Sequence, residues 1–124
     1  MDNQFYLHVG ANKTGTTHLQ ARLLDNAALL AGSGILYPDF SSCFASKPVS
    51  HWPLFVRCLR SSQDYYMFRA KDSSEEDRLR CLESSFQLFK SIVSRSGKTL
   101  FSAECICMFS VEEMVRVKTL LIES

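Results

Sequence analysis

The sequence predicts an α/β fold with parallel strand pairing, because segments typical of strands and of helices alternate along the chain. Residues 5–9 and 99–102 are short apolar runs of the kind that form buried strands. The residues between them are mostly polar loops and segments with helical periodicity. This order is typical of strands that lie side by side in a sheet and are joined by helical connections.

The first predicted strand, residues 5–9, ends at Gly10, and residues 10–15 contain two glycines and no long apolar side chain. We therefore expect a loop over residues 10–15 and a helix from residue 16 or 17. Apolar residues then recur at three- and four-residue steps, at Leu19, Leu23, Ala27 and Leu30. Gly32 and Gly34 end this helix, and residues 35–37 form a short extended piece before Pro38.

Residues 39–50 and 61–74 are predicted loops, and residues 51–59 between them form a short helix with Pro53 in its first turn. The clearest amphipathic helix begins at a capping box near Ser74 and ends at Gly97. Its apolar positions are Leu79, Leu82, Phe86, Phe89 and Val93. After the strand at residues 99–102, Ser110 and Glu113 begin a last helix with Met114, Val117 and Leu121 on its apolar side.

Two predicted strands make a thin parallel sheet, and the last predicted element is a helix where a further strand is expected. We therefore expect residues 1–124 to be a single domain that forms the N-terminal part of a larger fold.

Composition excludes several classes of protein. The chain of 124 residues has a net charge of +1, whereas a general nucleic-acid or membrane-surface binder needs a strongly basic field. No stretch approaches the roughly 18 apolar residues of a membrane span, and the N-terminus lacks the pattern of a signal peptide. We therefore expect a cytoplasmic protein, whose five cysteines are reduced and are mainly small core residues.

The loop between the first strand and the first helix has the composition of an anion site. Backbone N–H groups at a helix start have no partner within the helix, and the helix dipole favours negative charge there. Glycines let the backbone approach an oxyanion closely, hydroxyl groups add donors, and Lys13 adds a positive charge. The predicted ligand-binding residues are Gly10, Asn12, Lys13, Thr14, Gly15, Thr16 and Thr17.

The loop spacing nearly matches the P-loop pattern G-x-x-x-x-G-K-[ST] of nucleotide triphosphatases. In that pattern a lysine follows the second glycine and reaches the β- and γ-phosphates. Here Thr16 occupies that position and the lysine lies within the loop, as Lys13. This difference disfavours a P-loop nucleotide kinase or triphosphatase.

Residues 8–17, His-Val-Gly-Ala-Asn-Lys-Thr-Gly-Thr-Thr, resemble the 5′-phosphosulfate loop of sulfotransferases. Residues 6–38, which end in Gly-Ile-Leu-Tyr-Pro, are similar to bacterial-type sulfotransferase-like proteins, and His51 with Leu54 and residues 98–104 extend the likeness more weakly. The resemblance implies a P-loop-like fold with a parallel sheet and 3′-phosphoadenylyl sulfate as co-substrate. It also implies that the loop holds the 5′-phosphate, that Lys13 neutralises charge on the leaving oxygen, and that no metal ion is needed.

Transfer of the sulfuryl group to a hydroxyl or amine, on a carbohydrate or another small acceptor, requires a general base. Two residues are candidates. His51 follows a polar loop and opens a short helix, which is a suitable place at the rim of a cleft. Glu104 follows the second strand within an apolar stretch, where a carboxylate needs a partner or a function.

One element of the family is not found in this sequence. The family grips the 3′-phosphate with an arginine at the end of a later strand and a downstream serine, whereas Arg116 lies within the predicted last helix. A non-catalytic remnant or binding module of the same fold is therefore the alternative to an active sulfotransferase.

Overall fold

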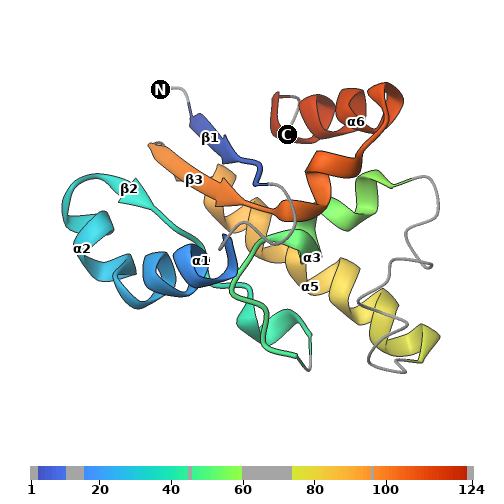
Figure 1. Cartoon of the computed structure of the whole chain (residues 1–124), viewed down its shortest axis with the longest axis horizontal. Coiled ribbons are helices and arrows are strands. Elements are labelled where there is room, and N and C mark those ends of the chain that lie inside the picture. The colour runs from blue at the N-terminus through green and yellow to red at the C-terminus, as the bar shows by residue number, and fades with distance from the viewer. Residues whose placement is uncertain (1–2, 11–15, 45, 60–73, 96, 123–124) are drawn as a thin grey trace.

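The computed structural model describes residues 3–10, 16–44, 46–59, 74–95 and 97–122, with the backbone alone at residues 16, 17, 107 and 108. Helices and strands alternate along the chain, as the sequence predicts (Figure 1). The strands are β1 (Gln4–His8), β2 (Ile35–Leu36) and β3 (Lys98–Ser102). The α-helices are α1 (Thr16–Asp25), α2 (Ala27–Gly32), α3 (Trp52–Phe55), α5 (Glu75–Val93) and α6 (Val111–Ile122). The 3-10 helices are η1 (Ser41–Cys43), η2 (Val56–Cys58) and η4 (Glu104–Met108).

The three described strands form one parallel sheet in the order β1-β3-β2. The register aligns Gln4 with Lys98 and His8 with Ser102, so β1 and β3 begin and end together. Parallel pairing between the two strands expected from the sequence is therefore confirmed. The extended piece after α2 is a third strand, because Ile35 and Leu36 pair with Lys98 and Thr99.

One face of the sheet is covered by α5. Phe101 of β3 is fully buried, and its ring centroid lies 5.9 Å from that of Phe5 and 6.2 Å from that of Phe89 on α5. Because side chains alternate along a strand, Phe5 and Leu7 contribute to this core, whereas Tyr6 on the other face is 49% exposed. The core therefore lies between the sheet and α5, and α3 also packs against α5.

The start of α5 matches the prediction, and four of its five predicted apolar positions pack in or against the core: Leu82, Phe86, Phe89 and Val93. The Ser74 hydroxyl accepts a hydrogen bond from Asp77 N at 3.1 Å, and the Asp77 carboxylate accepts one from Ser74 N, which completes a capping box. The predicted core position Leu79 is wrong, because this side chain is 52% exposed. The fully buried positions are Cys81, Ser85, Phe89 and Ile92, so the buried face includes Cys81 and Ser85, which were not among the predicted apolar positions.

The helix after the predicted anion loop is divided at Asn26 into α1 and α2. The Asn26 side chain donates to the carbonyl of Arg22 at 2.7 Å, a local side-chain bond of the kind that competes with helix continuation. Leu19, expected to be apolar core, is 43% exposed, while its neighbour Gln20 is 1% exposed. The inward face of α1 therefore includes a polar residue, which the periodicity does not reveal. No helix among the described residues has both the length and the apolar character that crossing a bilayer requires.

Candidate functional site

The predicted anion loop follows β1 and precedes α1 in the sequence. β1 ends at His8 beside Ser102, the last residue of β3, and the amide of Ala103 extends the pairing by donating to His8 O at 3.1 Å. After Gly10 the next described residue is Thr16, where α1 begins. The predicted binding residues Asn12, Lys13, Thr14 and Gly15 lie outside the described residues. The backbone of Thr16 and Thr17 forms the first turn of α1, as predicted.

Glu104 is brought to the same edge of the sheet. It is partly buried and opens η4, directly after Ala103. His8 aligns with Ser102, and the amide of Ala103 donates to His8 O. Glu104 therefore follows the end of β3 beside Val9 and Gly10, which follow the end of β1. The carboxyl ends of β1 and β3 therefore join the start of the predicted loop to one of the two predicted bases, at the edge where ligands commonly bind in parallel sheets.

His51 does not lie at the rim of a cleft, and this expectation is wrong. Its side chain is fully buried, and its ring centroid lies 4.5 Å from that of Tyr37 and 5.3 Å from those of Phe40 and Phe101. Imidazole Nδ1 accepts a hydrogen bond from Ser102 N at 2.8 Å, and Nε2 donates to Pro38 O at 2.7 Å. His51 can be buried because its two ring nitrogens form hydrogen bonds with the backbone of other segments. The polar loop that precedes it in the sequence does not reveal these distant partners.

The electrostatics of His51 agree with this structural role. Burial lowers its pKa to about 4, against the smaller opposing effects of the bond to Pro38 and the charge of Asp39. The imidazole is therefore neutral at pH 7, with its proton on Nε2. Both ring nitrogens are occupied by backbone groups, so a general base at this position would first have to break one of these bonds.

A buried polar network that the sequence does not reveal lies at the carboxyl edge. The Ser102 hydroxyl is 2.9 Å from Nδ1 of His8 and accepts a hydrogen bond from Gln20 Nε2, also at 2.9 Å. Ser102 is 0% exposed and Gln20 is 1% exposed. The network therefore fastens α1 to the ends of β1 and β3. The sequence gives only a weak indication that Gln20 is buried, since Gln20 shares a helical face with Leu23 and Ala27 at three- and seven-residue steps.

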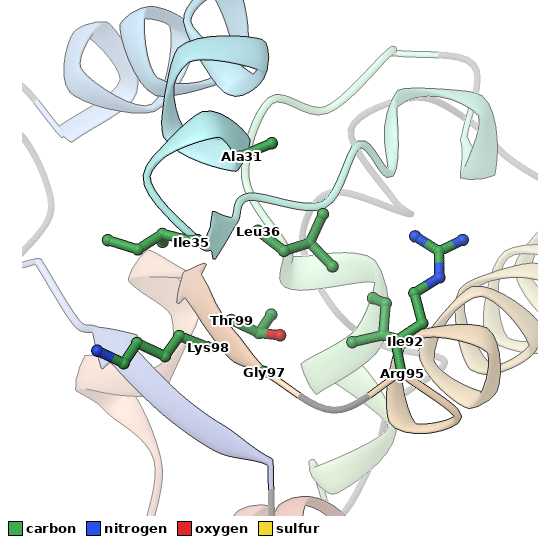
Figure 2. A pocket seen from close by; sticks show the side chains of 9 residues that line it. Ala31, Ile35, Leu36, Ile92, Arg95, Gly97, Lys98 and Thr99 are labelled. Carbon is green, nitrogen blue, oxygen red and sulfur yellow. The ribbon is translucent and has the colours of Figure 1, made fainter.

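A pocket of about 230 Å³ lies at the opposite edge of the sheet, where β2 and β3 begin. It is lined mainly by small and apolar residues together with Arg95 and Lys98, whose side chains extend in different directions (Figure 2). Arg95 follows the C-terminus of α5, where a cation offsets the partial negative charge of the last carbonyls. The same partial charge opposes an anionic ligand, so we do not assign the predicted site to this pocket.

The described cysteine side chains lie in the interior. Cys43, Cys58, Cys81 and Cys105 are free thiols and are buried, which confirms for these four the expected role as small core residues. Burial raises the pKa of Cys58 to about 11 and that of Cys81 to about 12. These thiols are therefore protonated at neutral pH and unsuited to nucleophilic chemistry.

Neither a metal site nor a 3′-phosphate site is evident in the described part of the chain. Its His, Cys, Asp and Glu side chains form no group of three or more that could hold a metal ion. Arg116 lies within α6, as expected, and donates to Cys58 O at 3.1 Å. This arginine connects α6 to the end of η2, which is a structural role.

Comparisons of the chain with protein-family models, with curated proteins and with solved structures find no match. The functional assignment therefore depends on the chemistry of the chain itself.

Proposed function

We propose that the carboxyl edge of the sheet binds the 5′-phosphosulfate of 3′-phosphoadenylyl sulfate and that the chain belongs to a sulfotransferase. The observation that supports this most is the side-by-side ending of β1 and β3, with α1 beginning at Thr16, six residues after Gly10 in the sequence. A strand, a glycine loop and a helix start in this order form the anion sites of many nucleotide-binding folds. The resemblance of residues 8–17 to the 5′-phosphosulfate loop of sulfotransferases supports the choice of ligand.

The charge distribution around α1 favours an anion at its start. The first turn of α1 has no acidic residue, so no carboxylate of that turn competes with a ligand for the first N–H groups. The hydrogen bond from Gln20 to Ser102 fixes α1 to the end of β3, beside the end of β1. In this proposal the loop amides and the hydroxyls of Thr14, Thr16 and Thr17 donate hydrogen bonds to the 5′-phosphate. The ammonium group of Lys13 offsets the negative charge of the phosphate.

The proposed reaction is an in-line transfer. A lone pair on the acceptor oxygen or nitrogen forms a bond to sulfur, while the bond between sulfur and the 5′-phosphate oxygen breaks. The electron pair of that bond leaves with the phosphate oxygen, whose developing charge Lys13 neutralises. The acceptor proton moves to a carboxylate, for which Glu104 is the candidate because it lies at the same edge of the sheet. His51 is a structural residue in this scheme.

We also propose the finer architecture. The three-stranded parallel sheet fits the N-terminal part of a P-loop-like sulfotransferase fold, in which the 3′-phosphate contacts come from a later segment. The acceptor class, a carbohydrate or another small hydroxyl or amine compound, follows from the resemblance alone. The proposed cytoplasmic location follows from the expected reduced state of the cysteines.

A ligand-binding assay with a charge-removal variant tests the proposal. We expect 3′-phosphoadenosine 5′-phosphate to raise the melting temperature of the chain without Mg²⁺. Lys13→Ala removes one charged contact with a phosphate and should weaken binding by roughly 10- to 100-fold. Lys118→Ala is the matched control, because Lys118 is exposed on α6.

Two results would contradict the proposal. One is equal stabilisation of wild type and Lys13→Ala, which would separate the ligand from the loop. The other is stabilisation by ATP with Mg²⁺ but not by 3′-phosphoadenosine 5′-phosphate, which would favour a nucleotide kinase or triphosphatase.

A further inference from the structure

The network at the carboxyl edge determines which nitrogen of His8 holds the proton. Gln20 donates an amide N–H to the Ser102 hydroxyl oxygen, which leaves the hydroxyl proton of Ser102 to be donated elsewhere. Among the described residues, the other group hydrogen-bonded to this hydroxyl is His8 Nδ1, at 2.9 Å. A hydroxyl has one proton and two lone pairs, so Ser102 accepts from Gln20 and donates to Nδ1.

The backbone of Ser102 supports this assignment. Its N–H donates to His51 Nδ1, and its carbonyl accepts from His51 N at 2.8 Å. Both backbone groups are therefore satisfied, and since Ser102 is 0% exposed, its hydroxyl has no access to solvent. A buried hydroxyl without an acceptor is costly, which favours the tautomer of His8 that has a lone pair on Nδ1 and the proton on Nε2.

His8 lies at the carboxyl edge of the sheet, where the phosphosulfate is proposed to bind. His8 is the last residue of β1 and precedes Val9 and Gly10. Its side chain lies on the face of the sheet that meets α1, since it shares Ser102 with Gln20. His8 is partly exposed, whereas its Nδ1 contact is with a fully buried residue, so the exposed part of the ring is away from Ser102. No described residue forms a hydrogen bond with Nε2.

We propose that His8 is a ligand-binding residue whose Nε2–H donates a hydrogen bond to an oxygen of the bound phosphosulfate. Ser102 and Gln20 are positioning residues that hold this tautomer and the orientation of the ring, as hydrogen-bonded partners do for functional histidines in general. This inference rests on the proposed function, since it takes its oxyanion ligand from there. No proton is transferred in this role, because the Nε2–H group acts only as a hydrogen-bond donor.

The tautomer can be measured without a ligand. Nitrogen NMR of the full chain at pH 8 should show a protonated Nε2 and a lone pair on Nδ1 for His8. Gln20→Leu removes the donor to Ser102 and should produce a mixture of the two tautomers. Gln87→Leu is the control, because Gln87 bonds Glu83 at an exposed position on α5. A proton on Nδ1 in the wild type would overturn the proposal.

The ligand contact is tested with 3′-phosphoadenosine 5′-phosphate as the probe. His8→Phe should weaken binding by roughly 10-fold, since one hydrogen bond to a charged group is lost, and His8→Gln should restore part of the affinity through its amide donor. A purely structural role would lower the melting temperature of His8→Phe and leave the affinity unchanged.

Comparison with the lysine variant separates the two proposals. If Lys13→Ala loses affinity and His8→Phe binds as tightly as wild type, the role of His8 is overturned and the loop assignment stands. If the probe does not bind the wild-type chain, both proposals are overturned.

Discussion

The buried imidazole of His51 makes a prediction about stability and pH. Burial lowers its pKa from 6.5 to about 4 in the folded protein, while the unfolded chain retains an ordinary histidine pKa. The neutral form is therefore favoured by folding. Its contribution to stability is complete above pH 6.5 and is lost as the pH falls from 6.5 toward 4.

The magnitude follows from the difference between the two pKa values. Each pKa unit corresponds to about 1.4 kcal/mol, so at pH 4 the protein should have lost about 3 kcal/mol from this group alone. That loss is a large fraction of the roughly 5–15 kcal/mol that stabilises a typical domain. The physical cause is that protonation would place a charge among Tyr37, Phe40 and Phe101 and would break the bond from Ser102 N.

The assay compares wild type with His51→Gln, which does not titrate but retains an acceptor and a donor. Urea unfolding at pH 7.5, 6, 5 and 4 gives the free energy of unfolding of both proteins. At pH 7.5 the variant should be less stable, because the backbone groups of Ser102 and Pro38 lose well-placed partners. Carboxylates affect both proteins alike, so the advantage of wild type should shrink by about 3 kcal/mol between pH 7.5 and pH 4. Parallel profiles for the two proteins would refute the reasoning.

Two further predictions concern the helix cap and the buried thiols. Ser74→Ala removes the capping box of α5 and should lower the free energy of unfolding by about 1 kcal/mol, whereas Ser91→Ala at an exposed position on the same helix should change it little; equal effects in chemical denaturation would contradict the role of the cap. Because burial raises the pKa values of Cys58 and Cys81 to about 11 and 12, iodoacetamide at pH 8 should modify them only in denaturant, as measured by peptide mass spectrometry; equally fast modification of the folded protein would contradict their burial.

The parts of the fold that were predictable depend on local patterns. The strands β1 and β3 are apolar runs bounded by loop residues, and α5 combines an N-terminal cap with apolar periodicity. β2 was expected only as an extended piece, because two residues contain too little pattern to specify pairing with β3. The division at Asn26 also escaped prediction, since apolar periodicity continues from α1 into α2 while the Asn26 side chain bonds Arg22.

The interior polar residues were harder to predict, because burial of a polar side chain depends on distant partners. Gln20 is buried through a hydrogen bond to Ser102, which is 82 positions away in the sequence. His51 is buried through Pro38 and Ser102. Leu79 is exposed because it lies outside the helical face that is fully buried, which contains Cys81, Ser85, Phe89 and Ile92. Local sequence therefore indicated the end of β1 and the start of α1, whereas tertiary contacts determine which polar side chains are buried beside the ends of β1 and β3.

The central claim is that an oxyanion binds at the carboxyl edge of the sheet, and mapping the ligand by amide chemical shifts tests it most directly. Addition of 3′-phosphoadenosine 5′-phosphate to the labelled chain should shift the amides of residues 8–17 and Glu104 most strongly. Amides around the opposite pocket, such as Arg95 and Lys98, should change little. Shifts concentrated at that pocket, or no shifts with a saturating ligand, would contradict the account.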